Sequence, residues 1–335
     1  MEKNKLLKRR YKILLNYIVG PILFIALSWS IYQKIKHQAN LQASWYVIRD
    51  VYKGPQKWYF WGVVALSIVN WGVEARKWQV LIRSIQKISL FKAFRAVLSG
   101  LALSLFVPNR VGEYLGRVLY MDEGNRLRSI ALTVVGGISQ LIITLVAGIA
   151  GLFYLRTYIL TGSTQMEGLS VFWLDGLMYA VVVGTILLIL LYYKLSWITL
   201  MLEKVPFISK YKYFIQNVED FHWKELTRIL SLSAGRFIVF IIQYMLMLKA
   251  FNVNIGLVDG GWTICVLFLV LAIIPTMPMA ELGVRGQASI QLFGLLSTNT
   301  VGIIATAAGI WCINLIIPAL AGSLFILGIK LFKKA

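Results

Sequence analysis

The sequence predicts an all-α polytopic membrane protein with about six full spans plus two re-entrant helical hairpins, arranged as an inverted-topology repeat. Three observations lead to this prediction: long apolar runs, the placement of the basic residues, and a short motif that occurs twice. The 335 residues are 59% hydrophobic and only 14% charged. Soluble domains do not contain several long uncharged apolar runs. We therefore expect a single transmembrane domain over residues 1–335.

Basic residues are unevenly distributed along the chain, whose net charge is +20. Most of the 34 Lys and Arg residues lie in the two termini and in segments 76–95, 110–128 and 194–228. Cytoplasmic loops of membrane proteins carry such an excess. We therefore expect an inner (plasma) membrane protein with both termini in the cytoplasm. Anionic or phosphate-bearing lipid headgroups are the expected partners, and nucleic acid is not, because no basic run accompanies a soluble fold.

Six apolar stretches approach the ~20 residues that a helix needs to cross a ~30 Å hydrocarbon core. The predicted spans are 13–32, 58–75, 129–155, 173–193, 229–248 and 301–329. The first is expected to be retained, because it is too long for the apolar region of a signal peptide.

Segments 93–120 and 262–297 lie between these spans and must each begin and end on one side of the membrane. The uncharged run in the first is only ~21 Å long as a helix, and that in the second only ~20 Å before Pro275. Both are therefore predicted to be re-entrant hairpins, although full crossings by both limbs would leave the sidedness unchanged.

Two halves of the chain then share one order of elements: span, hairpin, span. The first half covers 58–155 and the second covers 229–329, and they enter the membrane from opposite faces. Transporters use such inverted repeats to build a site from broken helices near the bilayer midplane. Between the halves, 195–226 has apolar residues at three- and four-residue steps. This pattern predicts an amphipathic helix on the cytoplasmic surface, or a linker that packs against the bundle.

Each hairpin carries one or two prolines followed by a Glu-x-x-x-Arg pair. On a helix such a pair contributes ~0.2–0.5 kcal/mol, whereas one charge at the bilayer centre costs ~2.5–3.5 kcal/mol. We therefore expect these side chains to face a polar cavity, other charges or a lipid headgroup. The alternative is a structural lock, in which Glu113 pairs with Arg110 or Arg285 to hold the hairpins together. The expected headgroup- or ion-binding residues are Arg110, Glu113, Arg117, Arg236, Glu281 and Arg285, and the expected turn residues are Pro108, Gly112, Pro275, Pro278 and Gly283.

Other charged residues in or near the spans can be explained without headgroup binding. Arg236 lies eight residues after Arg228, so it could extend its side chain toward the cytoplasm or bind a phosphate. Glu74, Arg76 and Lys77 are expected to anchor a helix end at the membrane interface.

A stripe of small and polar residues at four-residue steps in span 129–155 favours close helix packing over a cavity lining. The stripe consists of Gly136, Gln140, Thr144 and Gly148.

Residues for enzyme chemistry are sparse. The chain has no Gly-rich phosphate loop and no Ser-His-Asp or Cys-His arrangement. Its two histidines are isolated, and Cys265 and Cys312 lie in apolar stretches where they serve packing. We expect no catalytic residue, no metal site and no cofactor, and hence a protein that is not an enzyme.

The segment Pro108–Glu113, together with Arg117, resembles the Pro-x-Arg-x-Gly-Glu signature of the lysylphosphatidylglycerol synthase transmembrane-region family, also called flippase-like domain proteins. Gly283-Val284-Arg285 is similar to the second motif of that family, with Gly286 where relatives usually have Glu. The resemblance extends over nearly the whole chain and implies a membrane protein that translocates or handles an amphiphilic lipid. Full-length synthases add a soluble aminoacyl-transferase domain, and we expect this chain to lack it.

The sequence thus favours a lipid translocase, flippase- or scramblase-like, that moves a phospholipid or a lipid-linked sugar. The alternative is a non-catalytic membrane partner that presents lipid to a glycosyl- or aminoacyl-transferase. A third possibility, a membrane enzyme acting on polyprenyl-linked sugar, has less support because no catalytic group is evident.

Overall fold

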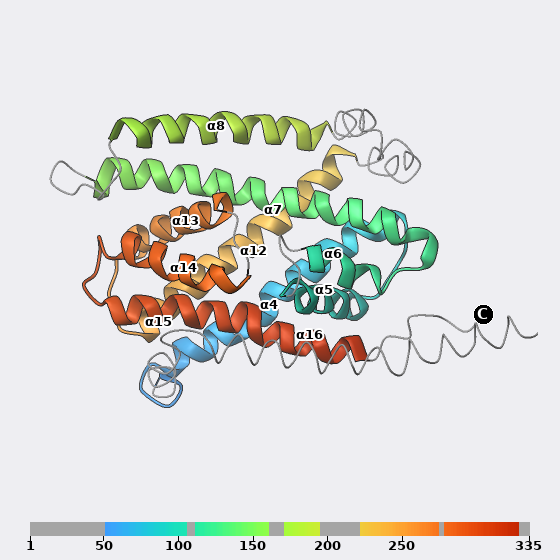
Figure 1. Ribbon diagram of the computed structural model, residues 1–335, viewed down its shortest axis with the longest axis horizontal. Coiled ribbons are helices and arrows are strands. Elements are labelled where there is room, and N and C mark those ends of the chain that lie inside the picture. The colour runs from blue at the N-terminus through green and yellow to red at the C-terminus, as the bar shows by residue number, and fades with distance from the viewer. Residues whose placement is uncertain (1–50, 106–110, 161–170, 195–221, 275–277, 328–335) are drawn as a thin grey trace, which may run out of the picture.

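The computed structural model describes residues 51–105, 111–160, 171–194, 222–274 and 278–327, without the side chains of 171–175, 177 and 278–281 (Figure 1). Every regular element in these ranges is a helix, which confirms the predicted all-α class for this part of the chain. The predicted span 13–32 lies outside the described residues, as does the predicted surface segment up to residue 221.

The helices follow the predicted order with shifted boundaries. They are α4 (Lys57–Leu81), α5 (Leu90–Ser104), α6 (Val111–Val118), α7 (Arg126–Tyr154), α8 (Val171–Tyr193), α12 (Trp223–Ala250), α13 (Leu257–Ile273), α14 (Pro278–Phe293), α15 (Thr300–Trp311) and α16 (Ile317–Leu327). A π-helical turn, Cys312–Ile316, joins α15 to α16, and another, Leu155–Ile159, follows α7. The final residues of the predicted surface segment 195–226 belong to α12, which begins after His222, whose ring nitrogen accepts from the Lys224 amide.

Three described stretches are long and apolar enough to cross a membrane: Glu123–Ile159, Trp223–Ala250 and Thr300–Leu327. They coincide with three of the predicted spans. Their outer faces carry exposed apolar side chains such as Phe153, Ile238 and Leu324. Exposed apolar side chains on long apolar helices suit contact with lipid tails.

Both predicted hairpin segments contain two short helices. In the first, α5 has 15 residues and α6 has eight. In the second, α13 has 17 and α14 has 16. The longest of these is ~25 Å, less than a ~30 Å hydrocarbon core. Helix lengths thus agree with segments that dip into the membrane, and re-entry itself stays a prediction.

An antiparallel pair, α4 and α12, runs through the centre of the molecule, with α5 and α6 on one side and α13 and α14 on the other (Figure 1). Gln56 bonds Asn252 at one end of the pair, and Arg236 donates to Asn70 Oδ1 over 2.7 Å further along. Around this pair the packing is reciprocal: α5 packs on α16, and α13 packs on α7. The first helix of each predicted hairpin segment therefore contacts the last long helix of the other predicted half.

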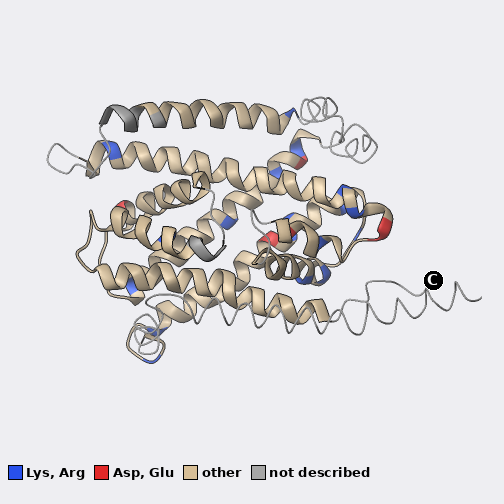
Figure 2. Cartoon of the chain, viewed as in Figure 1, with Lys and Arg blue, Asp and Glu red and all other residues tan. Residues whose placement is uncertain are grey.

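Charged residues are unevenly placed in the fold. Figure 2 shows Lys and Arg gathered toward the end of the molecule that holds α5, α6 and the start of α7. This end includes the basic segments that the sequence assigns to the cytoplasm.

Candidate functional site

Glu74 is the centre of a buried group of charges. Its carboxylate lies on α4 with a residue exposure of 5%. Lys77 Nζ lies 2.8 Å from Oε2, Arg117 Nη2 lies 2.9 Å from Oε1, and Arg236 Nη1 lies 3.0 Å from Oε2. Three helices, α4, α6 and α12, thus bring one carboxylate and three cations together. We call Glu74, Lys77, Arg117 and Arg236 the charge cluster.

Glycines position Arg117 in this cluster. A Cβ atom at Gly112 would lie 2.2 Å from the Leu103 carbonyl carbon, and one at Gly116 would lie 2.3 Å from the Gly100 Cα. Backbone atoms cannot move aside as a flexible side chain can. Glycine is therefore required where α6 contacts α5 backbone to backbone, and this contact sets the position from which Arg117 reaches Glu74.

Glu113 lies one turn before Arg117 on α6, and the two side chains are 3.6 Å apart between Oε2 and Nη2. The predicted helical pair is therefore present. Glu113 is more exposed than Arg117, with side-chain exposures of 24% and 4%. The first-motif carboxylate is thus partly open, whereas the first-motif guanidinium is enclosed.

Arg236 crosses from α12 to α4 and does not extend along its own helix toward the cytoplasm. Besides its bond to Glu74, its Nε donates to Asn70 Oδ1 over 2.7 Å. Its guanidinium carbon lies 5.0 Å from the Trp71 ring centre and 5.2 Å from that of Phe240. Aromatic faces attract guanidinium groups, so these two rings hold the side chain in place.

Lys77 links the cluster to α7. Its Nζ lies 3.3 Å from the Gly136 carbonyl oxygen and 3.4 Å from Ser233 Oγ. Ser233 Oγ in turn lies 2.8 Å from Ser139 Oγ. The small residue at Gly136 also admits Leu81, whose Cδ1 would be 2.7 Å from an added Cβ. The stripe in span 129–155 therefore serves close packing, as predicted, and supplies a carbonyl to the cluster.

Because the charges of the cluster are buried, each needs a close partner of opposite charge. Moving an ion out of water costs several kcal/mol, and close oppositely charged partners are needed to offset this. Glu74 provides that partner for three cations at once. The expectation that Glu74 and Lys77 anchor a helix end at the interface was wrong, because both are buried while Arg76 between them is exposed. Glu74 and Lys77 pair with each other, and Glu74 also pairs with Arg117 on α6 and Arg236 on α12, far away in the sequence.

A row of rings connects the second motif to the charge cluster. The Arg285 guanidinium carbon lies 6.0 Å from the Phe268 ring centre. Phe268 and Phe240 have ring centres 5.5 Å apart, and Phe240 is the ring that faces Arg236. Arg285 is itself buried, at 9% exposure. Arg285 of the second motif is thus connected to Arg117 of the first through two phenylalanines, Arg236 and Glu74.

Several predicted site residues cannot be placed. Arg110, Pro108 and Pro275 lie outside the described residues, as does the side chain of Glu281. Pro278 is the first residue of α14, directly after the undescribed residues 275–277. Gly283 lies within α14 and Gly112 lies within α6, so the two glycines are helical. At Gly112, glycine is required by the close contact with α5 described above. At Gly283, by contrast, an added Cβ would meet nothing within 4 Å.

Asn70, Glu74 and Lys77 were missed as site residues by the sequence interpretation. They follow one another at four- and three-residue steps, which places them on one face of α4. Polar and charged residues on one face of a mostly apolar helix are a functional signal, and that signal could have found them.

A protein-family comparison agrees with this architecture. The family model for the lysylphosphatidylglycerol synthase TM region matches residues 15–322. The chain belongs to this family. A comparison with curated proteins finds no match.

As a member of the lysylphosphatidylglycerol synthase TM region family, the chain is a membrane protein of lipid-related function. The match includes every described helix up to Gly322 in α16. It therefore covers both Glu-x-x-x-Arg motifs and all four residues of the charge cluster.

Proposed function

We propose that this protein translocates an amphiphilic lipid with a phosphate-bearing headgroup across the inner membrane, and that the headgroup passes the charge cluster. One observation carries the proposal: Lys77, Arg117 and Arg236 converge on the single carboxylate of Glu74, within 3.0 Å, in the interior of a lipid-related membrane protein.

The chemistry of the cluster suits a phosphate. Guanidinium groups bind carboxylates and phosphates with the same planar fork of N–H donors. Glu74 therefore occupies the position that a phosphate oxygen would take, and it keeps the cations paired when no lipid is present. A headgroup that displaces Glu74 from Arg117 and Arg236 exchanges one anion for another, so the cations need not be left unpaired in the interior.

The reciprocal packing of the two halves supports an inverted repeat. In such a repeat, equivalent helices of the two halves make equivalent contacts, as α5 with α16 and α13 with α7 do. The charge cluster would then lie where a transporter of this design binds its substrate. With the basic end of the bundle in the cytoplasm, acyl chains would stay in the bilayer while the headgroup moves between the halves.

In this proposal the protein moves a lipid between leaflets and does not modify it chemically. Purified protein reconstituted into vesicles should accelerate the movement of fluorescent phosphatidylglycerol between leaflets and leave the lipid chemically unchanged. Arg117→Lys keeps the positive charge but loses the planar set of N–H donors that suits a phosphate. The transfer rate should therefore fall at least ~10-fold, which corresponds to an activation free energy higher by ~1.4 kcal/mol.

Lys249→Gln is the matched control, because Lys249 is exposed at the far end of α12. Its transfer rate should equal that of the wild type. A transfer rate in the Arg117→Lys variant equal to that of the wild type would contradict the proposal. Retained lipid binding with no transfer by the wild-type protein would instead support a partner that presents lipid to a transferase.

A further inference from the structure

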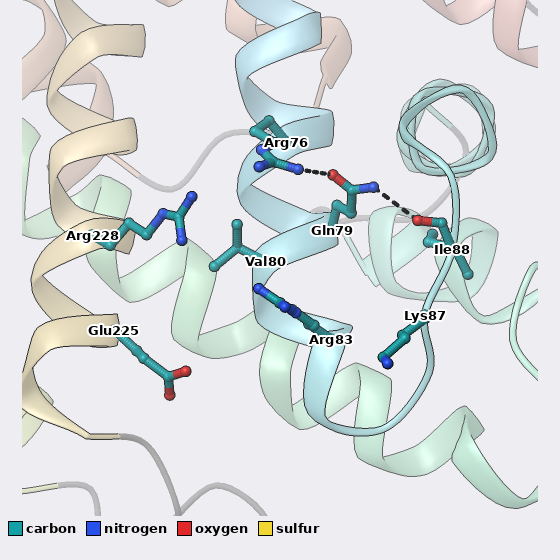
Figure 3. A pocket seen from close by; sticks show the side chains of 8 residues that line it. All are labelled: Arg76, Gln79, Val80, Arg83, Lys87, Ile88, Glu225 and Arg228. Atoms are coloured by element: carbon teal, nitrogen blue, oxygen red, sulfur yellow. Dashed lines mark hydrogen bonds between the residues drawn. The ribbon is translucent and has the colours of Figure 1, made fainter.

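A second basic site lies at the end of the central helix pair, separate from the charge cluster. It is a cavity of about 180 Å³ between α4, the connection to α5, and the start of α12 (Figure 3). Its polar lining consists of Arg76, Gln79, Arg83, Lys87, Glu225 and Arg228. We call it the basic pocket.

The basic pocket combines four cations with one carboxylate. Arg83, Lys87 and Arg228 are exposed, and none of them forms an ion pair with a described carboxylate. Glu225 lies one turn before Arg228 on α12 (Figure 3). A concave surface with such an excess of one charge focuses its field and attracts ions of opposite charge.

Hydrogen bonds and apolar packing hold one side of the pocket in place. Arg76 donates to the Gln79 side-chain oxygen, and the Gln79 amide donates to the Ile88 carbonyl oxygen over 2.8 Å (Figure 3). Gln79 thereby ties α4 to the connection that carries Lys87. Val80 and Ile88 add apolar surface and pack against the buried core. The cations therefore extend from a supported frame and not from a free loop.

The basic pocket lies apart from the charge cluster. Arg83 lies nine residues after Glu74, in the 3-10 turn Ile82–Ser84 that follows α4. Arg228 lies eight residues before Arg236 on α12, which is ~12 Å along that helix. The cluster cations are bound to a buried carboxylate, whereas the pocket cations are open to a ligand.

We propose that the basic pocket binds a phosphate group at the membrane surface. Its arginines supply the planar N–H forks that suit phosphate oxygens. A cavity of ~150 Å³ accommodates a molecule the size of benzene, so the pocket has room for a phosphate or pyrophosphate. The ligand is either the headgroup of an anionic lipid or a soluble phosphate anion. This site goes beyond lipid translocation and does not depend on it.

Two probes distinguish the two sources. Isothermal titration of the purified full chain with sodium pyrophosphate measures binding of a soluble anion. Native mass spectrometry after reconstitution in phosphatidylcholine discs with phosphatidate measures retention of a lipid. Binding of pyrophosphate alone assigns the pocket to a soluble phosphate, and retention of phosphatidate alone assigns it to a headgroup. Binding of neither probe overturns the proposal.

The variant Arg83→Gln/Arg228→Gln tests the location of binding. Both side chains are exposed, so the fold should be kept. Affinity should fall at least ~10-fold, because each charged hydrogen bond contributes ~1.5–3 kcal/mol. Lys57→Gln/Lys249→Gln removes the same charge from the opposite ends of the same two helices and should bind as the wild type does. Equal affinity in all three proteins, or an equal loss in both variants, would show binding by net charge alone and overturn the site.

The two proposals can fail separately. The pocket is tested by binding, and the charge cluster is tested by transfer between leaflets. An Arg117→Lys variant that transfers lipid normally while the basic pocket binds phosphate would remove the first proposal and keep the second.

Discussion

Arg236 on α12 donates from Nη1 to Oε2 of Glu74 on α4 over 3.0 Å, across 162 positions of sequence. The bond joins the first helix of one predicted half to the first helix of the other. Because both side chains are largely buried, with exposures of 13% and 6%, water screens this interaction little. The central helix pair is therefore held by charge as well as by apolar packing.

Glu74→Gln should destabilise the protein strongly. The amide keeps the shape of the side chain but removes the one anion that Lys77, Arg117 and Arg236 share. Breaking a buried ion pair from one side costs about 3–5 kcal/mol. Thermal unfolding in detergent should show a clear fall in Tm, whereas Glu225→Gln, which removes an exposed carboxylate, should change Tm little. An unchanged Tm for Glu74→Gln would contradict the role of Glu74 as central anion.

Glu74 and Arg236 should also be coupled energetically. Contacting residues in one network show interaction energies of about 0.5–3 kcal/mol in double-mutant cycles. The double variant Glu74→Gln/Arg236→Gln should thus lose less stability than the two single variants lose together. Denaturant unfolding of the four proteins measures the difference, and strict additivity would show that the observed contact contributes nothing.

Gly116→Ala tests the close contact between α5 and α6. The added methyl group would collide with the Gly100 backbone at 2.3 Å, so α6 must shift and carry Arg117 with it. Overpacking of this kind costs about 1–3 kcal/mol, and lipid transfer should fall as well. Gly137→Ala in α7 is the matched control, because nothing lies within 4 Å of the added atom.

That control should be neutral or slightly stabilising, since alanine is favoured over glycine in a helix by up to ~1 kcal/mol. Similar losses of stability in both alanine variants would mean that general helix effects, and not the contact with α5, explain the result.

The predicted sidedness can be tested with single cysteines. Lys87 and Lys249 are both exposed, and the topology places Lys87 in the cytoplasm and Lys249 outside. With Cys265 and Cys312 replaced by alanine, a membrane-impermeant maleimide should label Lys249→Cys in intact cells. It should label Lys87→Cys only after the membrane is opened. The reverse pattern would invert the topology.

The sequence predicted most of the framework. Long apolar runs located the three helical stretches that are long and apolar enough to cross a membrane. Prolines and short apolar runs located both pairs of short helices. Helix boundaries were less accurate: α4 continues to Leu81, beyond its predicted end at residue 75, because its last turns are buried against other helices.

The candidate site was only partly predictable. Arg117 and Arg236 were expected from their charge in apolar surroundings, and both lie in the cluster. Glu74 was assigned to the interface, together with Lys77, because its distant partners could not be seen: Arg117 is 43 positions away and Arg236 is 162. Charge partners so far apart are set by tertiary packing, and local spacing carries no information about them.

The glycine contacts have a mechanical consequence. An added Cβ at Gly322 on α16 would lie 1.9 Å from the Leu98 carbonyl oxygen on α5, so α16 touches α5 as closely as α6 does. Because backbone meets backbone at these glycines, we expect α5, α6 and α16 to shift together. Under the proposed translocation, a headgroup that enters between these three helices and α4 would have to open the Arg117–Glu74 ion pair.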